Sequence, residues 1–323
     1  MGLPAERGRL VFLDAGTLPC PLPFEAAFGP NWAWKLAYQA FDHTAPALVA
    51  ERIADAQLVI TNKVKLDAAL LQGAKHLQCI CVAAAGTDNI DKAAAQALGI
   101  PVHNVPDYGS DSVAEHAIAT LLALRRHLLA HAAAAVDGRW SNSSHFCWHG
   151  PKIRNVGGSL LGIVGRGHIG EATARLARGL GMHVRFAQRP GREAADDESP
   201  LEVLLAQTDA VSLHLPLTPQ TRGLINAKRL ALMRPHAVLI NTGRGAVVDT
   251  HALVDALRQG RIAGAAIDVL EIEPPPPTHP LLATQLPSLL LTPHIAWASE
   301  SAQQCLAEKL VGLVHDHFTP ARP

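Results

Sequence analysis

One segment decides the fold of this chain: Leu160-Leu161-Gly162-Ile163-Val164-Gly165-Arg166-Gly167-His168-Ile169-Gly170. Its apolar first half predicts a buried strand, and a helix is expected over residues 169–180. Gly165 permits a tight turn, Gly167 lets a pyrophosphate approach the backbone, and Gly170 allows the helix to pack closely on the strand. A glycine turn between a strand and a helix therefore predicts dinucleotide binding in preference to a purely structural turn.

Short apolar runs alternate with helical stretches along the rest of the chain. After the glycine turn, strands are expected at residues 183–187, 210–215, 237–241, 264–268 and 288–291. Such alternation is typical of an α/β protein with a doubly wound parallel sheet. Earlier runs predict a further α/β region before the turn, with strands at residues 10–13, 58–60 and 77–82. The dinucleotide fold is therefore expected inside the chain and not at its start.

The chain has 323 residues, which exceeds the size at which single cores usually stop growing, so we expect two domains. The residues after the last predicted strand are too few to form a domain of their own, and we expect them to return to the N-terminal domain. Residues 1–105 and 296–323 are therefore assigned to one domain. Residues 106–295 are assigned to an NAD(P)-binding Rossmann domain.

The composition favours a small-molecule ligand. With 28 Lys and Arg against 28 Asp and Glu, the formal net charge is zero, so no field attracts nucleic acid or an anionic membrane. The 5 cysteines form no C-x-x-C pair, and Cys79 and Cys81 lie in a predicted buried strand, which favours reduced thiols. No apolar run approaches the roughly 18 residues that span a bilayer, and no signal-type segment opens the chain. These features predict a cytoplasmic protein.

A long helix is expected over residues 112–136. Its apolar and alanine positions, among them Ile118, Leu121 and Leu128, make it too apolar to face water on all sides. The segment is either a core helix that links the two domains or a subunit interface. The residues alone leave both interpretations open.

The end of the second strand of the Rossmann domain sets the expected cofactor. NAD binding normally uses a carboxylate there to hold the adenosine ribose, and this chain has Gln188 instead. Arg189 and Arg192 follow, and guanidinium groups can bind a 2′-phosphate. NADP is therefore the expected cofactor and NAD the alternative, since the two arginines could also belong to a solvated loop. The phosphates are expected at the start of the helix, at His168 and Ile169.

Three polar residues each follow the carboxyl end of a predicted strand, where ligands of doubly wound sheets bind. They are Arg244, Glu273 and His294. The chain has 17 histidines, so His294 is distinguished by its position and not by its residue type. Composition cannot choose among the three residues.

These segments, in this order and after this glycine turn, resemble the D-isomer-specific 2-hydroxyacid dehydrogenase family. The resemblance covers nearly the whole chain and is carried by residues 82–91 (VAAAGTDNID), 165–170 (GRGHIG), 232–235 with 241–245 (LMRP and NTGRG) and 292–297 (TPHIAW). It implies a Rossmann domain inserted in a flavodoxin-like substrate domain, both of them doubly wound parallel sheets. Residues 62–64, 140–148 and 294–297 are similar to the glycerate dehydrogenase (hydroxypyruvate reductase) branch.

The resemblance implies reversible reduction of hydroxypyruvate or glyoxylate to the D-2-hydroxy acid, with hydride from the cofactor and no metal. It makes His294 the general acid and base, and imidazole suits that step because it titrates near neutral pH. Glu273 would orient the imidazole, and Arg244 would clamp the carboxylate and polarise the carbonyl of the substrate.

The family's other ligand residues are carried over position by position. The N–H groups of Ala85 and Gly86 would hold the substrate carboxylate, Lys63 would lie at the far end of the substrate, and Trp297 would bound the pocket. Cofactor residues are expected to include Thr242 and Asp268, the latter at the nicotinamide carboxamide. Asp268 could instead cap a turn, and Lys63 could be an ordinary exposed lysine.

The chain also departs from the family pattern. Ala85 replaces a valine, which matters little where only its N–H is used, and Gln188 replaces the common aspartate. Residues 112–136 match the family's dimerisation arm and so imply a homodimer. Two alternatives stay open: a dinucleotide-sensing regulator of the corepressor type, and a formate or phosphite dehydrogenase, which the Glu273 and His294 pair disfavours.

Overall fold

The computed structural model describes residues 8–284 and 286–319, which form two compact units. Of the described residues, 8–109 and 298–319 belong to unit 1, and 110–284 and 286–297 belong to unit 2. The predicted domain boundaries, after residues 105 and 295, lie a few positions before the boundaries of these units, which follow residues 109 and 297. Within the described part of the chain, no helix combines the length and the apolarity that crossing a membrane would require.

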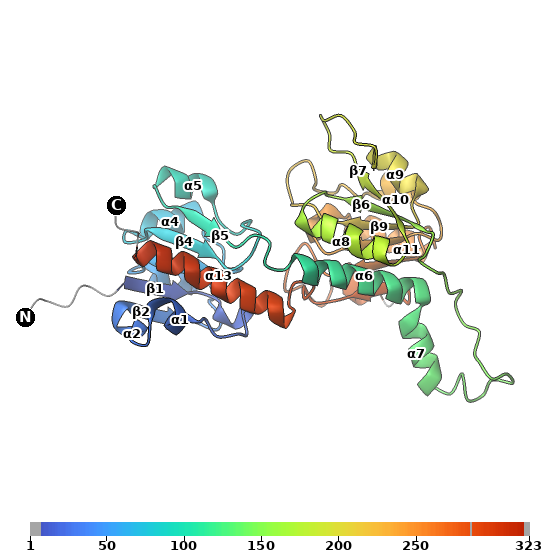
Figure 1. The fold of residues 1–323 in the computed structure, drawn as a ribbon, viewed down its shortest axis with the longest axis horizontal. Coiled ribbons are helices and arrows are strands. Elements are labelled where there is room, and N and C mark those ends of the chain that lie inside the picture. Colours follow the sequence, from blue (N-terminus) through green and yellow to red (C-terminus); the bar gives the residue numbers. More distant parts are fainter. Residues whose placement is uncertain (1–7, 285, 320–323) are drawn as a thin grey trace, which may run out of the picture. The chain divides into compact units, whose positions relative to one another are not determined.

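Unit 1 is built on a five-stranded parallel sheet of order β2-β1-β3-β4-β5 (Figure 1). Its strands are β1 (Gly8–Phe12), β2 (Leu36–Ala40), β3 (Leu58–Thr61), β4 (Cys79–Val82) and β5 (Val102–Asn104). Every residue of β3 and β4 is buried, as expected for central parallel strands covered on both faces. The strand order is that of the flavodoxin-like fold, as predicted.

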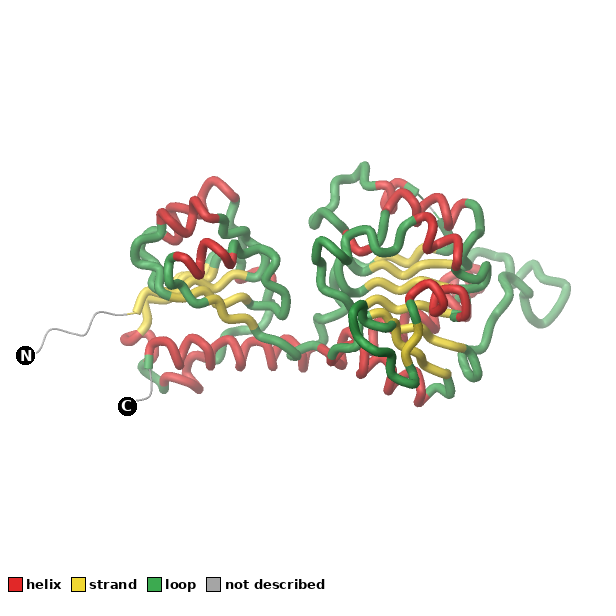
Figure 2. The backbone as a smooth tube through the Cα atoms, turned by 90° about the horizontal axis from the view of Figure 1, so that it is seen from above, coloured by secondary structure: helices red, strands yellow, loops and turns green. Residues whose placement is uncertain are grey.

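Helices cover both faces of this sheet (Figure 2). The core on one face includes residues of α3 (Val49–Ile53), α4 (Ala68–Gly73) and α5 (Lys92–Ala97). The C-terminal helix α13 (Glu300–Phe318) contacts β4 and α1 (Phe24–Phe28), so the end of the chain returns to the N-terminal sheet. The remaining elements are α2 (Trp32–Lys35) and the short 3-10 helices Ala15–Thr17 and Pro46–Leu48.

Unit 2 contains a seven-stranded parallel sheet of order β12-β11-β10-β9-β6-β7-β8. Its strands are β6 (Leu160–Val164), β7 (His183–Ala187), β8 (Glu198–Ser199), β9 (Ala210–Leu213), β10 (Val238–Asn241), β11 (Gly264–Ile267) and β12 (Leu289–Leu291). Counted from β6, six of these strands follow the Rossmann order 3-2-1-4-5-6. The predicted fold class, a Rossmann domain inserted within a second doubly wound domain, is confirmed.

The helices of unit 2 also form two layers. Residues of α6 (Ser110–Arg126) and α8 (His168–Gly179) share a core with β6 and β10, and the two helices pack against each other. The other core includes residues of α9 (Leu201–Gln207), α10 (Ala227–Leu232) and α11 (Thr250–Arg258). Two further helices are α7 (Leu128–Val136) and α12 (Pro280–Ala283), and a 3-10 helix spans Gly245–Val247.

The prediction of one continuous helix over residues 112–136 is wrong. The chain forms α6 and α7, divided at His127, whose φ of 47° lies in the left-handed region. Seven residues of α6 are buried, so that half is a core helix. Of α7 only Ala134 is buried, and Val136 is 87% exposed. The helix α7 leaves the direction of α6 and carries its apolar residues away from the core of unit 2 (Figure 1).

Candidate active site

The glycine turn has the geometry that its sequence predicts. Gly165 has a φ of 112°, and a Cβ there would lie 2.2 Å from the carbonyl oxygen of His214, so only glycine fits. A Cβ on Gly170 would lie 2.1 Å from the carbonyl oxygen of Gly165, which shows how closely helix and strand approach. A Cβ on Gly167 would meet nothing within 4 Å. The backbone at Gly167 is therefore open to a ligand, as pyrophosphate binding requires.

The first turn of α8 follows directly. Gly167 is its N-cap and has no side chain to occupy the N–H groups of the helix start, which favour an anion. The side chain of Arg166 does not serve this site. It contacts Glu171 at 2.7 Å and Asp197 at 2.8 Å and lies over the ring of Phe186. The residues present therefore fit a dinucleotide pyrophosphate held by backbone groups.

A carboxylate on β8 pairs with one of the arginines in the loop after β7. Gln188 donates to the carbonyl oxygen of Arg192 at 2.7 Å, and the guanidinium of Arg192 is ion-paired with Glu198. Glu198 stands on β8 opposite Phe186 of β7 and is buried. The N–H of Ala195 and the guanidinium of Arg192 lower the pKa of Glu198. Arg192 is thus engaged within the protein, whereas Arg189 is exposed.

Three adjacent strands bring the polar residues of unit 2 to one edge of the sheet. Arg244 follows β10, Asp268 follows β11, and His294 follows β12, and these strands are neighbours. A Cβ on Gly245 would lie 2.1 Å from the backbone of Leu270. This close approach sets the Arg244 segment against the loop that carries Glu273.

His294 and Glu273 are in direct contact. The Nδ1 atom of His294 lies 2.6 Å from Oε2 of Glu273, and both side chains are partly exposed. The other carboxylate oxygen of Glu273 accepts the N–H of Leu270 at 2.8 Å. An Nδ1–H that donates to a carboxylate fixes the tautomer and leaves Nε2 as the nitrogen that can exchange a proton.

Asp268 lies beneath the loop that carries His294 and is only 3% exposed. Its carboxylate accepts hydrogen bonds from the Thr292 hydroxyl at 2.5 Å and from the N–H groups of Ile295 and Ala296 at 3.0 Å each. Its carbonyl oxygen accepts the N–H of His294 at 2.8 Å. His294 has a φ of 56°, an unusual conformation for a residue with a side chain. These bonds hold His294 in that conformation, and the contact of Asp268 with the cofactor stays a prediction.

The sequence did not predict that His116, on α6, contacts the loop that carries His294. Nε2 of His116 lies 3.1 Å from the hydroxyl of Thr292. Since that hydroxyl donates to Asp268, it accepts the Nε2–H of His116. His116 lies 176 positions from Thr292 in the chain, and no motif marks it.

The loop that carries Glu273 is also held by contacts of Glu271. Glu271 accepts a hydrogen bond from the hydroxyl of Thr250, and its other oxygen lies 3.1 Å from Nε2 of the buried His279. Burial by itself would raise the pKa of Glu271, but the hydrogen bonds from Thr250 and His279 outweigh it and lower the pKa. The carboxylate is therefore ionised and ties the loop to α11 and to the residue before α12.

Unit 1 places its predicted substrate residues at the carboxyl ends of two adjacent strands. Lys63 follows β3, and Ala85 and Gly86 follow β4. The side chain of Asn104, at the end of β5, donates to the carbonyl oxygen of Ala85 at 2.6 Å. This bond orients the peptide group that links Ala85 and Gly86 and so directs the N–H of Gly86.

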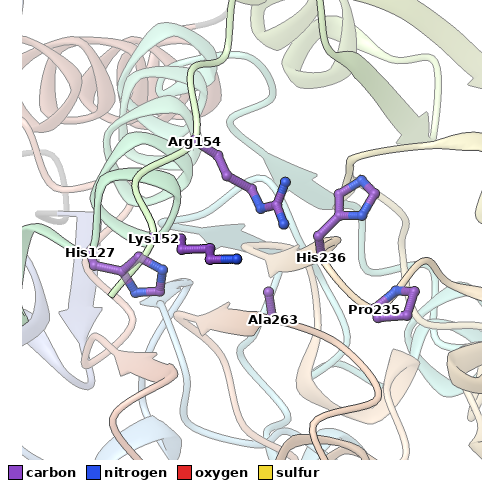
Figure 3. A pocket seen from close by; sticks show the side chains of 6 residues that line it. All are labelled: His127, Lys152, Arg154, Pro235, His236 and Ala263. Atoms are coloured by element: carbon purple, nitrogen blue, oxygen red, sulfur yellow. The ribbon is translucent and has the colours of Figure 1, made fainter. Parts of the chain in front are cut away.

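A hollow of about 330 Å³ lies elsewhere in unit 2 (Figure 3). Its lining comprises His127, Lys152, Arg154, Pro235, His236 and Ala263. Pro235 and Ala263 precede β10 and β11, so the hollow is at the amino edge of the sheet. The glycine turn and the residues that follow β10 to β12 lie at the opposite edge, and none of them lines it.

Known proteins resemble this chain throughout its length. Residues 118–296 match the family model described as D-isomer specific 2-hydroxyacid dehydrogenase, NAD binding domain. The chain belongs to this family. The predicted family membership is confirmed, and the chain is an NAD(P)-dependent 2-hydroxyacid dehydrogenase.

Relatives within the family agree with this assignment. The glycerate dehydrogenase of Methylorubrum extorquens is 41% identical over 98% of this chain and 97% of the relative. The glyoxylate reductase of Thermococcus litoralis is 39% identical over 83% of this chain and 82% of the relative. Among solved structures, an NADPH-dependent glyoxylate/hydroxypyruvate reductase of Sinorhizobium meliloti, in complex with NADP and malonate, has a TM-score of 0.81 at 30% identity, over 98% and 95% of the two chains.

A D-lactate dehydrogenase of Aquifex aeolicus, complexed with NAD and lactic acid, has a TM-score of 0.80 at 26% identity, over 96% and 95% of the two chains. The two structural neighbours differ in the dinucleotide that they bind. The 2-hydroxyacid dehydrogenase therefore takes NAD or NADP, and family membership does not select between them.

Proposed function

We propose that this 2-hydroxyacid dehydrogenase reduces hydroxypyruvate or glyoxylate to the D-2-hydroxy acid, reversibly, with His294 as general acid. The observation that carries the proposal is the 2.6 Å contact between Nδ1 of His294 and Oε2 of Glu273. It supplies an oriented imidazole at the carboxyl edge of the Rossmann sheet, the edge that binds ligands in this fold. Relatives named glycerate dehydrogenase and glyoxylate reductase support the substrate class.

In this proposal the cofactor, when bound, supplies the hydride to C2 of the keto acid. The protein supplies the proton, which passes from Nε2 of His294 to the carbonyl oxygen, and the electron pair of the C=O bond becomes the new O–H bond. Glu273 favours the protonated imidazole before the step by placing an anion against it. In the reverse direction Nε2 accepts the hydroxyl proton.

Arg244 is the proposed partner of the substrate carboxylate and carbonyl, because a guanidinium can bind both in one plane. The N–H groups of Ala85 and Gly86 and the ammonium of Lys63 are the proposed contributions of unit 1, and Trp297 the proposed limit on substrate size. These residues lie at strand ends or next to His294. Small anionic keto acids suit such a set of donors.

For the cofactor, we propose NADP before NAD. Gln188 cannot repel a 2′-phosphate as an aspartate would, and Arg189 is exposed beside it. Arg192 would contact the 2′-phosphate only if its ion pair with Glu198 broke. The proposed cofactor residues are Gly165, Gly167, His168, Ile169, Gln188, Arg189, Arg192, Thr242 and Asp268.

The assembly proposed is a homodimer joined through α7 and the segment after it. This part of the chain exposes large apolar side chains, with Phe146 93% and Leu129 63% exposed. Apolar side chains gathered on one projecting segment are typical of a protein contact. All five cysteines are free thiols, which supports a reducing, cytoplasmic location.

The test is a panel of 2-keto acids, each assayed with NADPH and with NADH by loss of the reduced cofactor's absorbance. Turnover of hydroxypyruvate or glyoxylate is expected. His294→Ala should lower kcat by about 100- to 10,000-fold without weakening NADPH binding. His183→Ala, an exposed histidine at the start of β7, is the matched control and should keep full turnover.

Absence of turnover with every keto acid, while NADPH binds, would refute the catalytic proposal and favour a dinucleotide-sensing regulator. Full turnover by His294→Ala would refute the proton step alone.

A further inference from the structure

Asp14 is a buried acid outside the residues already assigned to the site. It follows β1 at the carboxyl edge of the sheet in unit 1 and is 3% exposed. In that sheet β1 pairs with β3, with Phe12 opposite Ile60. Asp14 therefore stands beside the turn that follows β3, which is the turn that carries Lys63.

The carboxylate of Asp14 binds this turn through three successive backbone groups. Oδ1 accepts the N–H of Asn62 at 2.8 Å, and Oδ2 accepts the N–H of Lys63 at 2.6 Å and that of Val64 at 3.2 Å. Successive N–H groups that converge on one point form an anion-binding concavity. Here the anion is the carboxylate of Asp14, which lies 48 to 50 positions before these N–H groups in the chain.

Neighbouring side chains close the rest of the turn. The amide of Asn62 donates to the hydroxyl of Thr17 at 3.0 Å, and that hydroxyl donates to the carbonyl oxygen of Asp14 at 2.7 Å. The amide of Asn89 donates to the carbonyl oxygen of Val64 at 2.9 Å. The turn is held on both sides, while Lys63 itself is an exposed residue.

We propose that Asp14 is a positioning residue for substrate binding: its carboxylate fixes the backbone of the turn so that Lys63 meets the far end of the keto acid. The inference rests on the proposed function, which assigns Lys63 to the substrate. A lysine side chain has many rotamers, so the place of its Cα limits where its ammonium can reach. Asp14 sets that place without contacting substrate.

The neutral, nearly isosteric Asp14→Asn replaces one acceptor oxygen with an amide that faces backbone N–H groups. Hydrogen bonds to a charged acceptor are the strong ones, so KM for the keto acid is expected to rise about tenfold with little change in kcat. The cofactor residues lie in unit 2, so NADPH affinity should not change. Asp67→Asn is the matched control: Asp67 caps α4 in the same unit and holds no part of the turn.

A double-mutant cycle with Lys63→Ala distinguishes positioning from a merely structural role. If Asp14 acts through Lys63, Asp14→Asn raises KM in the native chain but adds nothing in the Lys63→Ala background. Thr17→Val loosens the same turn more gently and should raise KM about threefold, which keeps the test valid if Asp14→Asn does not fold. Thermal unfolding of each variant reports folding.

An equal rise in KM in both backgrounds, or no rise from Asp14→Asn and Thr17→Val while Lys63→Ala raises KM, would overturn the inference and leave the proposed function intact. An unchanged KM in Lys63→Ala would remove Lys63 from the substrate site and the inference with it. Loss of turnover in His294→Ala separately tests the proposed reaction.

Discussion

Nδ1 of His294 lies 2.6 Å from Oε2 of Glu273, and the two residues are 21 positions apart on loops that follow neighbouring strands. The same carboxylate accepts the N–H of Leu270, so Glu273 is fixed before it orients the imidazole. Proton transfer by His294 therefore depends on a second loop, and that loop is in turn tied by Glu271, Thr250 and His279.

Glu273→Gln removes the anion but keeps the size of the side chain. We expect kcat for keto acid reduction to fall about 10- to 100-fold, because a neutral amide no longer favours the imidazolium. Initial rates at saturating keto acid and cofactor would measure the fall. Native rates would show that Glu273 does not act on His294.

Asp268→Asn tests the support beneath His294. One of the carboxylate oxygens that accept from Thr292, Ile295 and Ala296 becomes an NH2 group, which leaves a buried N–H without an acceptor. The expected loss is about 1–3 kcal/mol in the free energy of unfolding, with a fall in kcat. Denaturant unfolding and steady-state kinetics give the two values. Asp249→Asn, at the N-cap of α11, is a control that should lose some stability but no activity.

Glu198→Gln tests the competition for Arg192. Without its carboxylate partner, Arg192 becomes available to a 2′-phosphate, and the preference for NADPH over NADH is expected to rise several-fold. Arg189→Ala should lower the same preference by about tenfold. The ratio of kcat/KM for the two cofactors is the measurement. If both variants keep the native ratio, the loop after β7 does not select the cofactor.

His214 predicts a pH-dependent stability. Burial lowers the pKa of His214 from its ordinary value of 6.5 to about 4. Between pH 6.5 and 4 this histidine is protonated in the unfolded chain but neutral in the folded chain. The free energy of unfolding therefore decreases as the pH falls from about 6.5 toward 4. His214→Gln, which titrates no proton, should flatten this part of the curve by about 1–3 kcal/mol. Denaturant unfolding at a series of pH values would show it, and an unchanged slope would contradict it.

Local pattern was enough to predict much of unit 2. Alternating apolar strands, the glycine turn and the start of α8 follow from steric and hydrophobic preferences that act within a few residues. The central strands β6 and β7 have the predicted bounds. By contrast the edge strands β2 and β5 carry weak patterns because they are partly exposed, and β8 carries one because it has only two residues.

Contacts between distant segments could not be read in this way. Several acidic residues follow Arg192 in the sequence, and His116 lies in a largely apolar helix, so the sequence does not identify the partner of either residue. Only the parallel pairing of β10, β11 and β12 sets Asp268 under His294, and only the pairing of β1 with β3 sets Asp14 against the turn of Lys63. The left-handed residue His127, which divides α6 from α7, has no signal in the helical pattern around it. Residue types and local spacing thus specify the elements and the chemistry of the strand ends, whereas strand order, a product of long-range packing, decides which of those side chains can touch.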